Sequence, residues 1–196
     1  MDDIILCGGF ARQKDMNQKV RYDESYFNKC LGYENQQIAN EINAGRILFV
    51  MRYHDGMVLD IGIGSGEFIK KRGRTHGYDV NPKAVEWLKE NGLYSDAFGG
   101  YSVFTFWDVL EHIEDHDFYF RHIKKGSYLF TSLPIFMDLN KIRESKHYRP
   151  GEHLWYWTEK GFVDWMFEKG FRFLEKRTFE IQAGREDILS FAFIRT

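Results

Sequence analysis

Three glycines at alternate positions in VLDIGIGSGEF, residues 58–68, limit most strongly what this chain can fold into. The apolar run before them predicts a buried strand that ends at Asp60, and the residues after them predict a helix that begins near Glu67. A loop without side chains can turn sharply and lets a ligand lie against the backbone. The segment therefore predicts a strand, a tight ligand-binding loop and a helix.

Short apolar runs alternate with amphipathic stretches from Met57 onward, which is typical of a mostly parallel sheet covered by helices. The last two runs are joined only by IQAGRED, which is too short for a crossover helix, so these two strands should pair antiparallel. The prediction is therefore a mixed α/β sheet. Its strands are expected within residues 57–63, 75–80, 93–98, 102–109, 127–136, 171–180 and 187–196.

Two helices have clear start signals. In residues 81–92, Asn81 can cap the first turn and Pro82 suits the first helical position. In residues 158–170, Thr158 can act as the cap, and apolar side chains recur with helical spacing. Both stretches are therefore predicted as helices that pack against the sheet.

Length and composition fit one globular domain with an appended segment. The 196 residues include 43% hydrophobic side chains, enough for a substantial core. Residues 1–56 are polar at first, then rich in tyrosine and phenylalanine, and a helical pattern follows within residues 34–54. We interpret residues 1–56 as an N-terminal lid or cap segment and residues 57–196 as the domain that carries the glycine loop.

Charge and cysteine content exclude several classes of protein. A formal net charge of -2 gives no surplus of positive charge to attract a nucleic-acid backbone. Cys7 and Cys30 are too few for a disulfide framework and lack zinc-site spacing. No apolar run approaches the ~20 residues that cross a bilayer. These features predict a cytoplasmic protein without a membrane segment, and leave open whether its copies form a homo-oligomer.

The residue at position 67 separates two classes of glycine loop. A dinucleotide site has the spacing G-x-G-x-x-G, with a third glycine at position 67 and helix N–H groups that face a pyrophosphate. The chain has Glu67 there, and a carboxylate in the first helical turn repels phosphate. The loop therefore favours a ligand without phosphate, such as a nucleoside with an amino-acid tail, over a dinucleotide.

Two acidic residues end the strands that follow the loop. Asp79 lies at the end of the second strand, where a carboxylate can accept hydrogen bonds from both ribose hydroxyls. Asp96 lies at the end of the third strand, where it could meet an adenine amino group. Together with the loop, these acids predict a nucleoside site at one edge of the sheet.

The chain resembles the class I methyltransferases that use S-adenosylmethionine. The resemblance covers most of residues 57–171 and rests on VLDIGIGSGEF, YDVNPKAVEWL, SDAF, FWDVLEHIED and GEHLWYWTEKGFVDWMFEKGF. The VLEHI segment is similar to the branch that includes ubiquinone-type and sugar methyltransferases. The resemblance implies a three-layer Rossmann-like methyltransferase fold, with a seven-stranded mixed sheet and an antiparallel last hairpin.

The same resemblance implies a set of residues that hold S-adenosylmethionine. Asp79 would bind the ribose, and Asp96 would complete the adenine side as argued above. The other residues implied are Asp60, Gly62, Gly64 and Gly66 at the methionine part, Val80 and Ala97 around the adenine, and Trp107 and Asp108 at the inner edge.

Methyl transfer to a hydroxyl oxygen needs alignment of the reactants and a group that accepts the proton. Histidine is the usual base, and two histidines are well placed: His153 in GEHLWYW, and with less support His112 in VLEHI. Tyr22 and Tyr26 in the N-terminal segment could fold over the acceptor and exclude water. We therefore expect His153 or His112 to be catalytic, and these two tyrosines to contact the substrate.

The run EHIEDH offers several potential metal ligands, but the sequence identifies no anchoring ligand elsewhere in the chain, so no metal is predicted. SLPIF resembles a signature of enzymes that methylate nucleic-acid bases. It follows the fifth strand instead of the fourth, and Leu133 replaces its first proline, so nucleic-acid methylation stays a minor alternative.

The sequence as a whole predicts an S-adenosylmethionine-dependent methyltransferase that acts on a small-molecule acceptor, with oxygen favoured as the methylated atom. Two alternatives belong to other classes. One is a non-catalytic regulatory or partner subunit that binds S-adenosylmethionine. The other is a dinucleotide-dependent oxidoreductase, which Glu67 disfavours.

Overall fold

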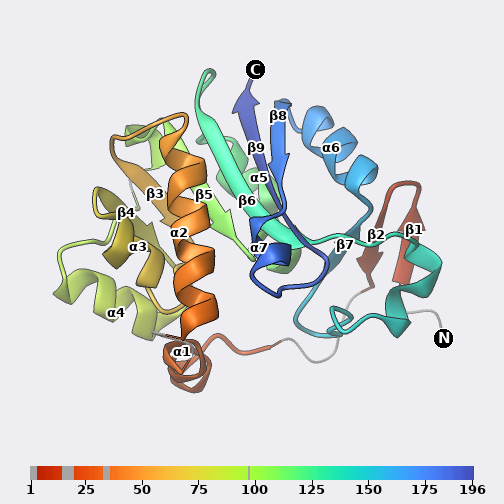
Figure 1. The fold of residues 1–196 in the computed structure, drawn as a ribbon, viewed down its shortest axis with the longest axis horizontal. Helices are drawn as coiled ribbons and strands as arrows, with labels where there is room; N and C mark the ends of the chain where they lie inside the picture. The colour runs from red at the N-terminus through yellow and green to blue at the C-terminus, as the bar shows by residue number, and fades with distance from the viewer. Residues whose placement is uncertain (1–3, 15–19, 33–35, 97) are drawn as a thin grey trace.

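The computed structural model describes residues 4–14, 20–32, 36–96 and 98–196. Its main sheet has six strands: β3 (Val58–Ile61), β4 (Thr75–Tyr78), β5 (Val103–Trp107), β6 (Tyr128–Pro134), β8 (Phe171–Arg177) and β9 (Ile188–Arg195). They lie in the order β4-β3-β5-β6-β9-β8 (Figure 1). The first four are parallel, and β9 is antiparallel to both β6 and β8, so the predicted mixed sheet and its antiparallel last hairpin are confirmed.

Helices cover both faces of this sheet and make the three layers of a Rossmann-like fold. Alternation along β5 shows this, because successive side chains of a strand point to opposite faces. Trp107 belongs to one buried cluster with Phe49, whereas Phe106 belongs to a second cluster with Phe162. The helices are α2 (Gln37–Met51), α3 (Glu67–Arg72), α4 (Pro82–Glu90), α5 (His116–Phe120) and α6 (Glu159–Glu168).

Both predicted helix caps are present. The Asn81 side chain accepts a hydrogen bond of 3.0 Å from the Lys83 backbone N–H at the start of α4. The Thr158 hydroxyl accepts one of 3.0 Å from Gly161 at the start of α6. These side chains satisfy N–H groups that a helix terminus otherwise leaves unpaired, which is why the sequence places both helices correctly.

The strand predicted at residues 93–98 is reduced to a single bridge, so the sheet has six strands and not seven. Tyr94 pairs with Gly77 beside β4, and backbone bonds join Gly77 to Leu93 and Ser95. The chain then enters the short helix η1 (Phe98–Gly100), where the Phe98 ring packs 4.9 Å from the Tyr78 ring. Burial of this aromatic side chain turns the backbone away from the sheet edge.

A second sheet that the sequence did not predict joins the N-terminal segment to the middle of the chain. It consists of β1 (Ile4–Cys7), β2 (Phe10–Gln13) and β7 (Trp155–Trp157), in that order and antiparallel. In Figure 1 it lies on the opposite side of the molecule from α3 and α4. Within the segment interpreted as a lid, α2 is a layer of the core, because its Phe49 and Val50 are buried.

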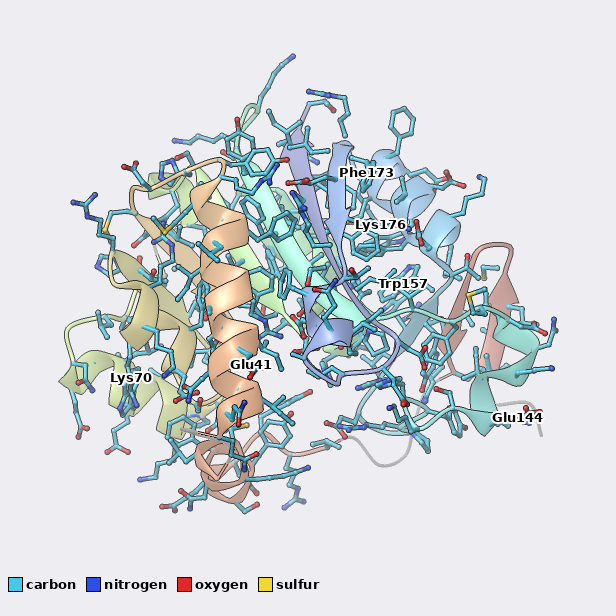
Figure 2. The ribbon with its side chains drawn as sticks, viewed as in Figure 1. Glu41, Lys70, Glu144, Trp157, Phe173 and Lys176 are labelled. Carbon is cyan, nitrogen blue, oxygen red and sulfur yellow. The ribbon has the colours of Figure 1, made fainter. Side chains whose placement is uncertain are left out.

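Strand β8 forms one edge of the main sheet. Its Phe173 and Lys176 side chains lie at this edge, far from Lys70 of α3 (Figure 2). The strand also carries Arg172, Glu175 and Arg177, and charged side chains at an exposed edge discourage pairing with another strand. No helix within the described residues is both long enough and apolar enough to cross a membrane.

The hairpin of the small sheet packs so tightly on α6 that Gly161 should not tolerate a side chain. A Cβ there would overlap the backbone of Gly9, whose carbonyl accepts a hydrogen bond from the Thr158 N–H. We expect Gly161→Ala to lower the free energy of unfolding by about 1–3 kcal/mol, as overpacking does, although the same change in an open helix stabilises by about 1 kcal/mol. Urea unfolding followed by circular dichroism measures the difference.

Gly100→Ala is the matched control, because no atom lies within 4 Å of a Cβ at this exposed position. Its stability should stay close to that of the unmodified chain. Equal stability of both variants would contradict the tight hairpin–helix contact.

Candidate functional site

A cavity of about 1240 Å³ opens at the carboxyl ends of the parallel strands, which is where sheets of this type bind ligands. Most residues predicted for the site line it: Tyr22, Tyr26, Asp60, Gly62, Gly64, Asp79, Val80, Trp107, Asp108, His112 and His153. Gly66 and Asp96 are not among the lining residues, and Asp96 is exposed. Ala97 lies outside the described residues.

The three glycines of the loop serve different purposes. All have positive φ, at 73° for Gly62, 56° for Gly64 and 78° for Gly66. A Cβ on Gly62 would lie 2.6 Å from a Val109 methyl group, and one on Gly66 would lie 2.8 Å from the Trp87 ring. Only Gly64 has no atom within 4 Å of an added Cβ. Packing within the protein therefore requires two of the glycines, and Gly64 leaves backbone open toward the cavity.

Asp79 closes the glycine loop from the neighbouring strand. One carboxylate oxygen accepts a 2.9 Å hydrogen bond from the Ile63 N–H, and the other accepts a 2.8 Å bond from the Asn81 N–H. Burial raises the pKa of this carboxyl above its usual value, although these two hydrogen bonds act to lower it. A carboxylate oxygen can accept more than one hydrogen bond. Asp79 is thus fixed by the backbone and retains acceptor capacity toward the cavity.

Two further acids of the loop region are buried. Asp60 accepts a 2.6 Å hydrogen bond from the Thr105 hydroxyl, and burial raises its pKa to about 7. Glu67 begins α3 and lies 3.4 Å from the Asn43 amide and 3.5 Å from the Lys71 ammonium. The position that a dinucleotide site reserves for glycine is therefore filled by a held carboxylate, which disfavours a pyrophosphate.

A cluster of four charges borders the cavity. Arg46, Asp108 and Arg185 are partly buried and line it, and Glu180 is fully buried beside them. Asp108 pairs with Arg46 at 2.7 Å and with Arg185 at 2.9 Å, and Glu180 pairs with the same two arginines, at 2.8 Å to Arg46. Burial alone would raise the pKa of Asp108, but the two guanidinium groups outweigh it and hold that pKa well below its usual range. Arg46 also stacks 5.0 Å above the Trp107 ring.

Sequence reasoning missed three members of this charge cluster. Arg46 lies on α2, Glu180 on the short helix α7 (Phe179–Gln182), and Arg185 in the loop before β9. A charged residue within the apolar stretch AGRILFVM of α2 was the available signal. Asp108 lines the cavity as predicted, but both of its carboxylate oxygens accept hydrogen bonds from arginine.

The two predicted histidines, His112 and His153, lie side by side in the wall of the cavity. The rings of His112 and His153 are 4.7 Å apart and nearly perpendicular. His112 uses its Nδ1 in a 2.8 Å bond with the Glu152 carbonyl. Burial lowers the pKa of His112, and it lowers the pKa of His153 to about 3, so both imidazoles are neutral near pH 7.

Glu111 shares this wall with the two histidines. The pKa of Glu111 is raised well above its usual value, chiefly by burial and to a lesser extent by repulsion from Asp108. Of the other acids and histidines in EHIEDH, Asp115 caps α5 and His116 bonds to the Leu110 carbonyl at 2.7 Å. Among the described residues, the buried side-chain atoms without a hydrogen-bond partner include Trp107 Nε1, Glu111 Oε2 and His153 Nδ1, all from residues that line the cavity.

The two predicted substrate-binding tyrosines, both in the N-terminal segment, line the cavity. Tyr22 and Tyr26 pack edge to face with centroids 5.0 Å apart, and Tyr22 lies 6.5 Å from the His112 ring. Burial raises the pKa of both phenols. Helix α1 (Glu24–Leu31) carries Tyr26 and has Asp23 as its cap, so a regular element positions Tyr26, and Tyr22 lies directly before the cap.

A family model described as a methyltransferase domain matches residues 35–176, a span that begins inside the segment interpreted as a lid. The chain is also similar to an S-adenosylmethionine-dependent methyltransferase, a possible histamine N-methyltransferase, from Thermotoga maritima. The TM-score is 0.59 at 12% identity, over 88% of this chain and 99% of that chain.

Two further solved structures share the fold. The N-methyltransferase NodS from Bradyrhizobium japonicum WM9, in complex with S-adenosyl-L-homocysteine, has a TM-score of 0.56 at 15% identity, over 87% of this chain and 97% of that chain. The [4+2]-cyclase SpnF has a TM-score of 0.60 at 14% identity, and the match covers 87% of this chain and 91% of that chain. No curated protein matches the chain.

The charge cluster predicts that removal of a buried acid lowers the free energy of unfolding much more than removal of an exposed acid. Glu180→Ala leaves Arg46 and Arg185 with Asp108 as the one remaining acid of the cluster, and we expect the free energy of unfolding to fall by about 3–5 kcal/mol. Urea unfolding measures the loss. Glu159→Ala is the control, because Glu159 pairs with Lys176 at an exposed position and should cost less than about 1 kcal/mol. Similar losses in the two variants would contradict a structural role for the cluster.

Proposed function

This chain belongs to the class I S-adenosylmethionine-dependent methyltransferases, and from that premise we propose that it methylates an oxygen atom of a small-molecule acceptor. The observation that carries the proposal is that one cavity contains both the glycine loop with Asp79 and the pair His112–His153. Its volume of about 1240 Å³ exceeds the ~300–1000 Å³ typical of a site for one ligand. The cavity therefore has room for the cofactor and for an acceptor.

The residues of the loop fit the cofactor. The open side of Gly64 accommodates a ligand against the backbone, and Asp79 can accept hydrogen bonds from two hydroxyls. We propose that Asp60 and Gly62 border the methionine part, Val80 the adenine and Trp107 the inner edge; Asp96 and Ala97 stay predictions for the adenine side. When bound, S-adenosylmethionine supplies a methyl group on a positively charged sulfur.

His153 is the better candidate for the proton acceptor. Its Nδ1 has no hydrogen-bond partner, whereas the Nδ1 of His112 is engaged by the Glu152 carbonyl. In the proposed reaction His153, or else His112 through Nε2, takes the proton of the acceptor hydroxyl as its oxygen displaces the sulfur in line. Tyr22 and Tyr26 orient the acceptor and exclude water from the reacting atoms.

A small acceptor is favoured over nucleic acid. Two cations that line the cavity are paired with acids, Lys146 with Glu186 at 2.6 Å and Arg149 with Glu152 at 3.3 Å. The net charge of -2 adds no attraction for a phosphate backbone. We propose a cytoplasmic reaction because both cysteines are free thiols. Measurement of the native mass in solution would show whether copies of the chain associate.

Incubation of the protein with a metabolite extract and S-adenosylmethionine that carries an isotopically labelled methyl group tests the proposal. Mass spectrometry should find the label in a small metabolite, attached to oxygen. Binding of the cofactor without transfer would instead favour a regulatory subunit. Labelling of added RNA or DNA in place of metabolites would favour a nucleic-acid methyltransferase.

Asp79→Ala should weaken the binding of S-adenosyl-L-homocysteine by about 1–3 kcal/mol, because ribose hydroxyls would lose their acceptor. This corresponds to an increase in Kd of about 5- to 150-fold, measured by isothermal titration calorimetry. Asp164→Ala removes an exposed acid that pairs with Lys160 on α6, outside the cavity lining, and should leave the Kd unchanged. An unchanged Kd for Asp79→Ala would remove Asp79 from the site.

His153→Ala should lower kcat by about 100-fold or more, since a positioned base contributes about 10²–10⁴-fold. The Kd for S-adenosyl-L-homocysteine should change less than threefold. His122→Ala is the control, because His122 stacks on Phe98 and does not line the cavity. Equal losses of cofactor affinity and turnover in His153→Ala would assign His153 a structural role.

A further inference from the structure

Glu111 is not explained by the proposed methyl transfer. Its side chain is only 2% exposed, and its Oε2 has no hydrogen-bond partner among the described residues. A buried carboxylate without a partner is costly, because it loses its hydration and gains no compensating charge. Arg185 attracts Glu111 only from a distance, since both arginines of the charge cluster form their ion pairs with Asp108 and Glu180. Glu111 can therefore carry a negative charge here only beside a cation that the described part of the chain does not provide.

Two imidazoles lie where ligands of such a cation would be needed. Glu111, His112 and His153 each offer one ligand atom, and these three atoms lie within 4.8 Å of one another. The distance from His112 Nε2 to Glu111 Oε1 is 4.0 Å. His153 is 4% exposed and its Nδ1 has no partner among the described residues. Two of the three side chains thus carry a buried atom without a hydrogen-bond partner among the described residues.

Hydrogen bonds to backbone carbonyls hold the segments that carry these three residues together. The Leu154 N–H donates to the Glu111 carbonyl at 2.7 Å, and the Trp155 indole donates to the Ile113 carbonyl at 2.8 Å. His112 Nδ1 bonds to the Glu152 carbonyl, so the ring carries its proton there and leaves the Nε2 lone pair free. Histidine ligands of metals are typically oriented by such a bond from the second nitrogen.

We propose that Glu111, His112 and His153 hold a divalent transition cation, such as Mn²⁺, Co²⁺ or Zn²⁺, at the acceptor end of the cavity. Two imidazoles and one carboxylate suit these ions, whereas Mg²⁺ prefers ligand sets made of oxygen. With metal–ligand distances of about 2.1 Å, ligand atoms in a tetrahedral site lie about 3.4 Å apart. The three side chains would approach one another by up to about 1.4 Å on binding, which small side-chain rotations supply.

The site has three protein ligands, so the cation keeps open positions, and all three residues line the cavity. Resting on the proposed function, we assign these positions to the oxygen of the acceptor. The bound hydroxyl becomes more acidic and releases its proton to water. The oxygen electron pair then forms the bond to the methyl carbon while the carbon–sulfur bond breaks and leaves its pair on sulfur. In this form the two histidines act as ligands instead of proton acceptors.

The test is direct binding of cations to the purified full chain, which needs neither acceptor nor turnover. Protein stripped with EDTA is titrated with Mn²⁺, Zn²⁺, Co²⁺ and Mg²⁺ by calorimetry, and the visible absorption of Co²⁺ reports its ligands. We expect one transition cation per chain and at least 10-fold weaker binding of Mg²⁺. Equal affinity for Mg²⁺ would overturn the assignment of the two imidazoles as ligands.

Glu111→Gln keeps the side-chain shape and removes the charge. We expect it to weaken binding of Co²⁺ by about 100-fold or more, because even residues that only orient metal ligands contribute about 10- to 100-fold. Glu159→Gln removes the same charge from an exposed side chain on α6, and His122→Asn removes a histidine; neither residue lines the cavity, and both variants should bind Co²⁺ normally. Circular dichroism checks that each variant is folded, and His153→Asn replaces Glu111→Gln should the latter unfold.

The outcomes separate this inference from the proposed function. A folded chain that binds S-adenosyl-L-homocysteine but no transition cation overturns the metal site and leaves the methyltransferase intact. Cation binding that Glu111→Gln and His153→Asn do not weaken also overturns it, because the cation then lies elsewhere. Cation binding that both variants abolish supports the site, even in a chain that transfers no methyl group to any small molecule.

Discussion

The buried cluster of Arg46, Asp108, Glu180 and Arg185 holds the cavity in shape. It joins α2, the turn after β5, α7 and the loop before β9, which are far apart in the sequence. Two cations and two anions balance there, and buried charges require such balance. Asp108 adopts a φ of 57°, which costs a residue with a side chain about 1 kcal/mol or more. Two arginines on its carboxylate offset that strain and direct the chain into the helical turn η2 (Leu110–His112).

Local signals predicted much of the fold. The caps Asn81 and Thr158 act on N–H groups two or three residues away, so their helices begin where the sequence indicates. The strand ends follow from apolar runs, which reflect burial on both faces of a parallel sheet. The glycine loop was also predicted, but only because a loop without side chains lets a ligand approach the backbone. The structure shows that contacts within the protein require two of the three glycines. Val109 and Trp87 crowd two of the glycines, and these contacts depend on side chains 47 and 21 positions away.

Features that depend on distant partners could not be predicted. The small sheet forms only when β2, which pairs with β1, also pairs with β7 about 150 residues later. Strand β7 has three residues, too few for an alternating pattern that would indicate a strand. The edge strand at residues 93–98 was overpredicted, because its composition suits a strand while burial of Phe98 turns the backbone away. The pairing of EHIEDH with His153 could not be predicted for the same reason. His153 lies about 40 residues further along the chain, and the hydrogen bond from the Leu154 N–H to the Glu111 carbonyl brings the two segments together.

The chemistry at this wall depends on how many charges it contains. The four-charge cluster is neutral as a unit, and burial keeps His112 and His153 uncharged, so an ionised Glu111 would be an uncompensated negative charge. Without a cation, burial favours the protonated form of Glu111, and under the proposed function the lone pairs of the histidines are free to accept a proton from the acceptor. With a cation, Glu111 ionises and the same lone pairs become ligands. Under the two proposals, one arrangement of three side chains supports two modes of activating a hydroxyl. Because a lone pair serves only one partner at a time, occupancy of the proposed site by a metal would decide between them.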